Sequence, residues 1–130
     1  MDISKDKLLE MYRTMQKIRH FESKARDLAM AAELPGFVHV SIGEEASATG
    51  VCAALRKTDR ITSNHRGHGH LIAKGGRLDR MMAEIFGKRT GYCKGKGGSM
   101  LSSITRSASS APTASSALDC RSPPAPRWAQ

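Results

Sequence analysis

The residues best suited to chemistry lie at positions 64–70, in the stretch Asn-His-Arg-Gly-His-Gly-His. Three histidines and one arginine are interspersed with glycines, directly after a segment that we expect to form a strand. A fixed guanidinium beside imidazoles suits a phosphate or diphosphate, and loops that follow strands are where α/β folds place ligands. The glycines would let such a ligand approach the backbone closely. His65, His68 and His70 could instead ligate a metal ion, although no cysteine or carboxylate completes the set, and an ordinary polar surface loop is a further alternative.

Two other features could carry chemistry. The basic, glycine-rich run at 94–99 superficially resembles a phosphate-binding P-loop, but only three residues separate Gly91 from Gly95, and Gly97 stands where a serine or threonine should follow the lysine. This run could still hold a phosphate, or it could be a solvated flexible loop. His39 lies near the start of a predicted helix, and a lone histidine is more often structural than catalytic.

The elements that would position these residues follow from the spacing of apolar side chains. Between residues 7 and 32 they recur every three or four positions, which predicts one long helix with a single apolar stripe. Pro35 and Gly36 end that helical region. Further along we expect an extended stretch at 37–40, a helix at 43–55, a short strand at 60–63 and a helix at 78–86. Helices alternating with short strands predict an α/β architecture.

The chain has the size of one modest domain and a strong positive charge. Its 130 residues carry a net charge of +9, which suits nucleic acid, an anionic membrane or a phosphorylated small molecule. Only 5% of the residues are aromatic and no known nucleic-acid-binding motif is recognisable, which argues against nucleic acid. No apolar run approaches the roughly 20 residues of a membrane span. The three cysteines lack CxxC spacing and fit free thiols in a reducing cytoplasm, so we expect a cytoplasmic protein that binds neither nucleic acid nor membrane.

The composition changes after Met100. Residues 101–130 contain no lysine and no glutamate and are dominated by serine, alanine and proline. So few apolar side chains cannot offset the entropy of an ordered chain. We therefore expect a folded domain at 1–100 and a disordered tail at 101–130.

Six segments occur in an order and spacing that resemble one known family. They run nearly continuously from Lys7 to Met100 and are Gly36-Phe37-Val38-His39, Gly43-Glu44-Glu45-Ala46, Ile61-Thr62-Ser63, His65-Arg66-Gly67-His68-Gly69, Met82-Ala83-Glu84 and Gly95-Lys96-Gly97-Gly98-Ser99-Met100. The family is the alpha subunits of thiamine-diphosphate-dependent dehydrogenases that act on pyruvate, branched-chain 2-oxo acids or acetoin. The stretch HRGHGH is most similar to the acetoin branch.

The resemblance implies a role for five residues. Arg66 matches an arginine that binds the diphosphate of the cofactor, His65 matches its hydrogen-bonding neighbour, and Phe37 matches an aromatic residue lining the cofactor pocket. His39 and His68 match active-site histidines that handle protons or orient the substrate adduct. The implied fold is the N-terminal part of a thiamine-diphosphate-binding fold, with an incomplete parallel sheet.

The resemblance also implies a reaction and partners. Such a dehydrogenase uses thiamine diphosphate and Mg²⁺ to cleave a 2-oxo acid or acetoin, and it passes the acyl unit to a lipoyl group. The expected partners are a beta subunit, in a heterotetramer, and a lipoyl-bearing acyltransferase component. Two alternatives stay open: a small basic nucleic-acid-binding module, and a non-catalytic fragment that docks on partner subunits through its long helix.

The tail departs from the family, which continues with a Gly-Asp-Gly motif and a later asparagine that hold Mg²⁺. Back-translated and read one base out of register, residues 111–129 permit Ala-Asn-Gly-Ile-Val-Gly-Ala and then Gly-Leu-Pro-Leu-Ala-Ala-Gly-Ala-Ala-Leu-Gly, which is the family's own string. Two positions have no freedom, since Asp119-Cys120 must yield leucine and Trp128-Ala129 must yield glycine. We therefore expect residues 101–130 to be an out-of-frame tail, from a gene lesion or a sequencing error, and the fragment to be inactive alone.

Overall fold

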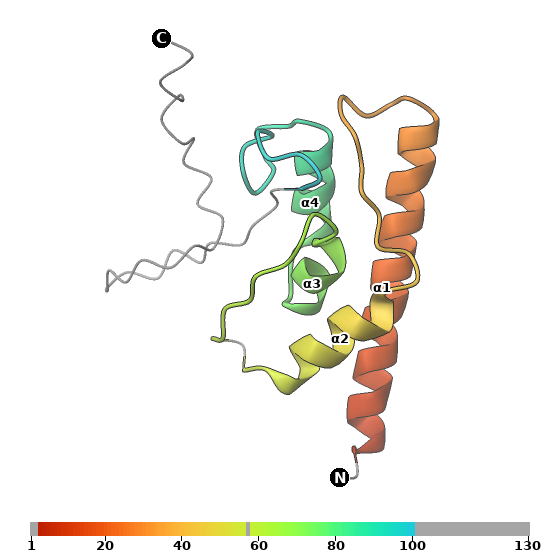
Figure 1. Cartoon of the computed structure of the whole chain (residues 1–130), viewed down its shortest axis with the longest axis vertical. Helices are drawn as coiled ribbons and strands as arrows, with labels where there is room; N and C mark the ends of the chain where they lie inside the picture. The colour runs from red at the N-terminus through yellow and green to blue at the C-terminus, as the bar shows by residue number, and fades with distance from the viewer. Residues whose placement is uncertain (1–2, 57, 101–130) are drawn as a thin grey trace, which may run out of the picture.

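Four helices form the part of the chain that the computed structural model describes, residues 3–56 and 58–100 (Figure 1). They are α1 (Lys5–Met30), α2 (Glu45–Ala54), α3 (His68–Ala73) and α4 (Leu78–Ile85). The predicted out-of-frame tail at 101–130 lies outside the described residues. None of the four helices is long and apolar enough to cross a membrane.

Helix α1 confirms the long helix predicted at 7–32, with each end shifted by two residues. Its first turn is capped by Ser4, whose side chain accepts a hydrogen bond from the Lys7 backbone at 3.3 Å. It ends in a Schellman motif, because Glu33 N–H donates to the Leu28 carbonyl while Ala32 adopts a left-handed φ of 55°. The chain then runs back along α1 towards α2 (Figure 1).

The core lies where α1 meets the three shorter helices. Every helix contributes to it, and α1 contacts both α2 and α3 while α2 contacts α3. The buried apolar residues are Ile18, Phe21, Ala25, Ala48, Leu71, Ile72, Met81 and Ile85. A Cβ atom on Gly69 would lie 3.1 Å from the Ala48 Cβ and 3.5 Å from the Ile18 Cγ2. The absence of a side chain at Gly69 therefore lets α3 approach α1 and α2, which is a packing role rather than the predicted ligand contact.

The helices predicted at 43–55 and 78–86 are confirmed as α2 and α4, but the strand predicted at 60–63 is not seen. Residues 37–40 and 60–63 have no regular secondary structure, and the described residues contain no strand, so the α/β architecture and its parallel sheet are not seen in this part of the chain. A strand needs a neighbouring backbone with which to pair. At 37–40 the backbone bonds to side chains instead, because His39 N–H donates to Ser99 Oγ and the Val40 carbonyl accepts from Arg66.

The glycine- and histidine-rich segment also differs from the expected loop, since its second half forms α3. Helix α3 begins at His68, so the last two histidines of the segment lie on a helix rather than in a flexible connection. Its apolar residues Leu71 and Ile72 are buried in the core. Tertiary packing therefore stabilises a helix too short to persist alone.

Candidate functional site

His68 is the most enclosed of the predicted site residues. Its side chain is 1% exposed, and both ring nitrogens have partners: Nδ1 lies 3.1 Å from Glu22 Oε2, and Nε2 lies 3.2 Å from Ser99 Oγ. The ring also packs edge-on against Phe21, with centroids 5.6 Å apart. These contacts come from α1, α3 and the glycine-rich segment, so three parts of the chain fix the orientation of one imidazole.

Glu22 is a functional candidate that the sequence reasoning missed. Its carboxylate is fully buried, and its second oxygen, Oε1, accepts a 2.6 Å hydrogen bond from Ser41 Oγ. A signal was present in the sequence, because Glu22 stands four residues after Ile18 and three before Ala25, on the apolar stripe of α1. A carboxylate at such a position must be paired, since burying an unpaired charge is very costly.

His39 and His65 lie beside each other, as the family resemblance predicts for residues of one site. Their rings are 5.2 Å apart between centroids and meet edge to face at 86°. The backbone N–H of His39 donates to Ser99 Oγ at 3.1 Å, so Ser99 bonds to both predicted catalytic histidines. The Nδ1 atom of His39 is buried and has no hydrogen-bond partner among the described residues, whereas His65 is exposed.

Arg66 is held close to the same histidines. Its guanidinium donates to the backbone carbonyl of Val40, next to His39, and its backbone N–H donates to Asn64 Oδ1 at 2.9 Å. Phe37 does not share this enclosure, because its side chain is 93% exposed. The structure thus brings together four of the five predicted site residues and leaves the fifth in solvent.

The three histidines of the 64–70 segment do not converge on a metal ion. His68 bonds to Glu22 and Ser99, His70 Nδ1 lies 3.2 Å from Ser63 Oγ, and the His65 ring contacts His39. Within residues 3–56 and 58–100, no group of three or more histidine, cysteine or acidic side chains could hold a metal ion. Among the described residues, nothing therefore supports the metal-ligand alternative for this segment.

The glycine-rich segment is folded onto α4 by a second buried carboxylate, that of Glu84. Glu84 Oε2 accepts hydrogen bonds from the backbone N–H groups of Cys93, at 2.7 Å, and Gly95, at 3.0 Å. Its other oxygen accepts from Gly97 N–H at 2.7 Å. Backbone N–H groups that converge on one point can bind an anion, and here the anion is a side chain of the same chain. The amides of Cys93, Gly95 and Gly97 are therefore bonded to Glu84 rather than open to a phosphate.

Glu45, in the predicted helix-opening segment, is fixed by an ion pair across the fold. Arg19 on α1 donates twice to its carboxylate, at 2.6 and 3.1 Å, and Gly43 N–H donates to it at 3.0 Å. The hydrogen bonds from Arg19 lower the pKa of Glu45 from 4.5 to about 2. This pair ties the start of α2 to α1 and so holds the connector that carries His39.

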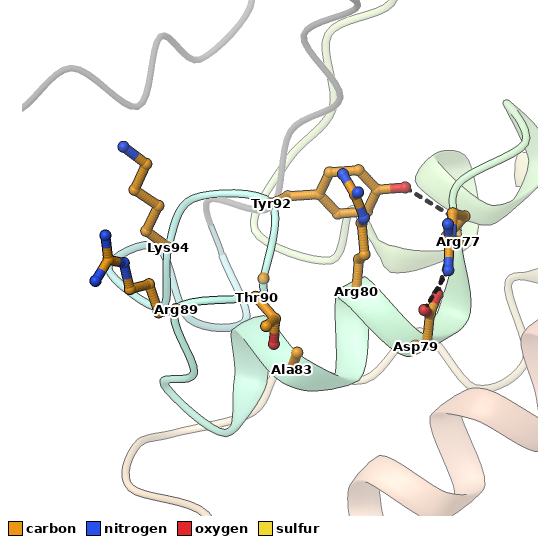
Figure 2. A pocket seen from close by; sticks show the side chains of 9 residues that line it. Arg77, Asp79, Arg80, Ala83, Arg89, Thr90, Tyr92 and Lys94 are labelled. Atoms are coloured by element: carbon orange, nitrogen blue, oxygen red, sulfur yellow. Dashed lines mark hydrogen bonds and ion pairs between the residues drawn. The ribbon is translucent and has the colours of Figure 1, made fainter.

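An open hollow of about 610 Å³ lies apart from these residues, between the start of α4 and the glycine-rich segment. None of the five predicted site residues lines it. Figure 2 shows Arg77 bonded to Asp79 and to the Tyr92 hydroxyl, with Arg80 rising beside the Tyr92 ring. The side chains of Arg89 and Lys94 extend away from that ring (Figure 2), so the basic groups of this hollow do not converge on one point.

Comparison with known proteins agrees with the resemblance found in the sequence. A family model described as "Dehydrogenase E1 component" matches residues 13–125. The chain is 61% identical over 100 residues to the alpha subunit of an acetoin:2,6-dichlorophenolindophenol oxidoreductase from Bacillus subtilis, and 50% identical over 98 residues to the subunit of the same name from Cupriavidus necator. It is 43% identical over 99 residues to a pyruvate dehydrogenase E1 component subunit alpha from Rhizobium meliloti. These matches cover 75–77% of this chain but only 28–30% of each relative. On the strength of the family match, the chain belongs to the dehydrogenase E1 component family.

Proposed function

We propose that this chain contributes the first part of an alpha subunit in a thiamine-diphosphate-dependent dehydrogenase that cleaves acetoin or a 2-oxo acid and passes the acyl unit to a lipoyl group. The observation that carries the proposal is the clustering of His39, His65, Arg66 and His68 around Ser99 and the connector at 37–41. The higher identity to the two acetoin relatives than to the pyruvate relative makes acetoin the first substrate to test.

The residues fit the diphosphate end of the cofactor. Arg66 supplies a fixed guanidinium, and the exposed His65 next to it supplies an imidazole, both suited to phosphate oxygens. The Nδ1 atom of His39, which is buried and has no partner among the described residues, supports a further polar contact in this place. When bound, thiamine diphosphate supplies a nucleophilic carbon and an electron sink for breaking a carbon–carbon bond.

The residues do not fit Mg²⁺, since the described part of the chain holds no cluster of metal-ligating side chains. We therefore assign these residues binding and proton-handling roles only. Arg66 and His65 hold the diphosphate, and His39 and His68 hold or move a proton beside it. Because the described residues offer no metal site, the isolated chain should have no turnover, and it needs the remainder of the assembly, including a beta subunit.

One observation favours a second role as a subunit-docking fragment. The N-terminal end of α1 projects beyond the other helices (Figure 1), and the side chains of Leu8 and Tyr12 are 50% and 58% exposed. Apolar side chains in such a row suit a partner surface. Co-purification of the chain with a beta subunit, without activity, would favour this role.

The test of the cofactor site is a calorimetric titration of the purified chain with thiamine diphosphate and, separately, with thiamine. We expect weak binding that needs the diphosphate, that Arg66→Ala abolishes, and that the matched change Arg13→Ala on the exposed face of α1 leaves intact. Equal binding of thiamine, or equal loss in both variants, would overturn the assigned site. Acetoin-dependent reduction of 2,6-dichlorophenolindophenol should appear only when the missing part of the assembly is supplied.

The out-of-frame tail stays a prediction. Resequencing the gene from the Lys94 codon to beyond Gln130 tests it directly. One extra base just after the Met100 codon would make the tail a sequencing error, and a confirmed deletion would make it a gene lesion. A sequence that restores no family-like reading frame in either case would contradict the prediction.

A further inference from the structure

We propose that Glu22 and Ser99 are positioning residues for the two predicted catalytic histidines: Glu22 holds the proton of His68 on Nδ1, and the Ser99 hydroxyl links His68 Nε2 to the backbone of His39. The proposal rests on the proposed function, because the roles of the two histidines come from it. It adds two residues that neither the sequence motifs nor the relatives' names assign.

The first step is burial. Glu22 is 0% exposed, His68 is 1%, and Ser41 and Ser99 are 4% and 6% exposed. Water cannot readily reach polar groups that are so enclosed, so these donors and acceptors must form their hydrogen bonds with each other. The direction of each bond can therefore be worked out from the chemistry of the groups.

The second step is the direction of the bonds. A carboxylate only accepts hydrogen bonds, so Glu22 accepts from Ser41 at Oε1 and from His68 at Oε2. This places the His68 proton on Nδ1, and a neutral imidazole then has a lone pair on Nε2. Ser99 donates its hydroxyl proton to that lone pair, while its oxygen accepts the N–H of His39. The opposite tautomer would point a nitrogen lone pair at the Glu22 carboxylate, which is repulsive.

The third step is what this arrangement can do. A serine, a histidine and a carboxylate in this order resemble the nucleophile–base–orienter set of hydrolases. Ser99 is buried, however, and its oxygen already accepts from His39, so it suits a link rather than a nucleophile. The link couples the ring of His68 to the backbone of His39, and a proton gained on Nε2 would reverse the Ser99 bond.

The experiment measures by NMR which ring nitrogen of His68 carries the proton, in the full 130-residue chain with ¹⁵N-labelled histidine at about pH 8. In the unaltered chain we expect the proton on Nδ1 of His68. A proton on Nε2 in that chain would overturn the proposal, whether or not any variant folds.

The variants separate positioning from packing. In Glu22→Gln the new amide can donate to Nδ1, so the population with the proton on Nε2 should rise, and Glu22→Asp should restore the original tautomer. Ser99→Ala should keep the tautomer but speed the exchange of the His39 amide by about tenfold, the change expected for the loss of one hydrogen bond. The exposed Glu33→Gln is the control for both readouts and should change neither.

These readouts do not depend on the cofactor. An unchanged tautomer in Glu22→Gln, or an unchanged His39 exchange rate in Ser99→Ala, would refute the positioning roles while leaving the Arg66-dependent binding test intact. In the reverse result, the His68 tautomer would change in Glu22→Gln but the chain would show no diphosphate-dependent binding. That result would refute the proposed function, and with it any catalytic role for the hydrogen bonds of Ser99.

Discussion

Replacing Glu84 with glutamine should destabilise the chain and loosen the glycine-rich segment. The change keeps the size and shape of the side chain but replaces one carboxylate oxygen with an NH₂ group. Three backbone N–H groups point at that carboxylate, from Cys93, Gly95 and Gly97. The amide oxygen of the glutamine can accept from the N–H groups of Cys93 and Gly95. The NH₂ group then faces the N–H of Gly97, which loses its hydrogen-bond acceptor.

The size of the effect follows from those three bonds. A buried donor left without a partner costs about 1–3 kcal/mol, and a hydrogen bond that loses its charged acceptor weakens by about 1 kcal/mol. Gly95 and Gly97 are only partly buried, so water can replace some of the lost bonding. We therefore expect the free energy of unfolding to fall by about 2–4 kcal/mol, a large share of the 5–15 kcal/mol typical of a domain.

The assay is urea unfolding followed by circular dichroism, together with amide hydrogen exchange. With m-values of about 1–3 kcal/mol/M, the unfolding midpoint should fall by roughly 1–3 M. The amides of Cys93, Gly95 and Gly97 should exchange at least about tenfold faster, and the exposed change Glu33→Gln should alter neither measurement. An unchanged midpoint with unchanged exchange at these three amides would refute the view that Glu84 organises the segment.

Two further predictions concern the ion pair and the tight packing around α4. Hydrogen bonds from Arg19 lower the folded-state pKa of Glu45 to about 2. The stability that this ion pair contributes should therefore be constant above about pH 4.5 and should decrease as the pH falls towards 2. In Arg19→Met, an acid unfolding titration should no longer show this pH-dependent loss of stability. Gly95→Ala should lower the free energy of unfolding in urea by at least about 2 kcal/mol, because Gly95 has a φ of +78° and a new Cβ would lie 2.3 Å from the Gly87 carbonyl. The control is Gly36→Ala, where a new Cβ would meet nothing within 4 Å. Its free energy of unfolding should stay within about 0.5 kcal/mol of that of the unaltered chain.

Helices were the most predictable part of the fold. The apolar spacing in the first part of the chain locates α1, because a helix that buries one face repeats its apolar residues every three or four positions. Its end was less certain, since the Schellman motif uses Ala32 rather than the glycine that such positions usually hold. Helix α3 was missed because its sequence begins with His68, Gly69 and His70, which are poor helix formers without tertiary packing.

The predicted extended stretch at 37–40 and the predicted strand at 60–63 are both short, and local sequence is least informative about such short segments. A segment such as 37–40 becomes a strand only if another backbone pairs with it, and nothing within the segment specifies that partner. Here side chains from distant positions, Ser99 and Arg66, provide the hydrogen-bonding groups. Such long-range contacts cannot be read from the spacing of residues within the segment.

The histidines and the arginine of the candidate site could be predicted from their residue types, but the residues that hold them in place could not. Histidine and arginine stand out in a sequence because few other residues carry their chemistry, whereas Glu22 and Glu84 are two glutamates in a chain with many acidic and basic residues. Their importance comes from burial, which depends on the whole fold. Both carboxylates connect to Ser99 through one intermediate: Glu22 bonds to the His68 ring that Ser99 also bonds, and Glu84 bonds to the backbone of the segment that leads to Ser99. A change at either glutamate should therefore disturb the hydrogen bonds between Ser99 and the two predicted catalytic histidines.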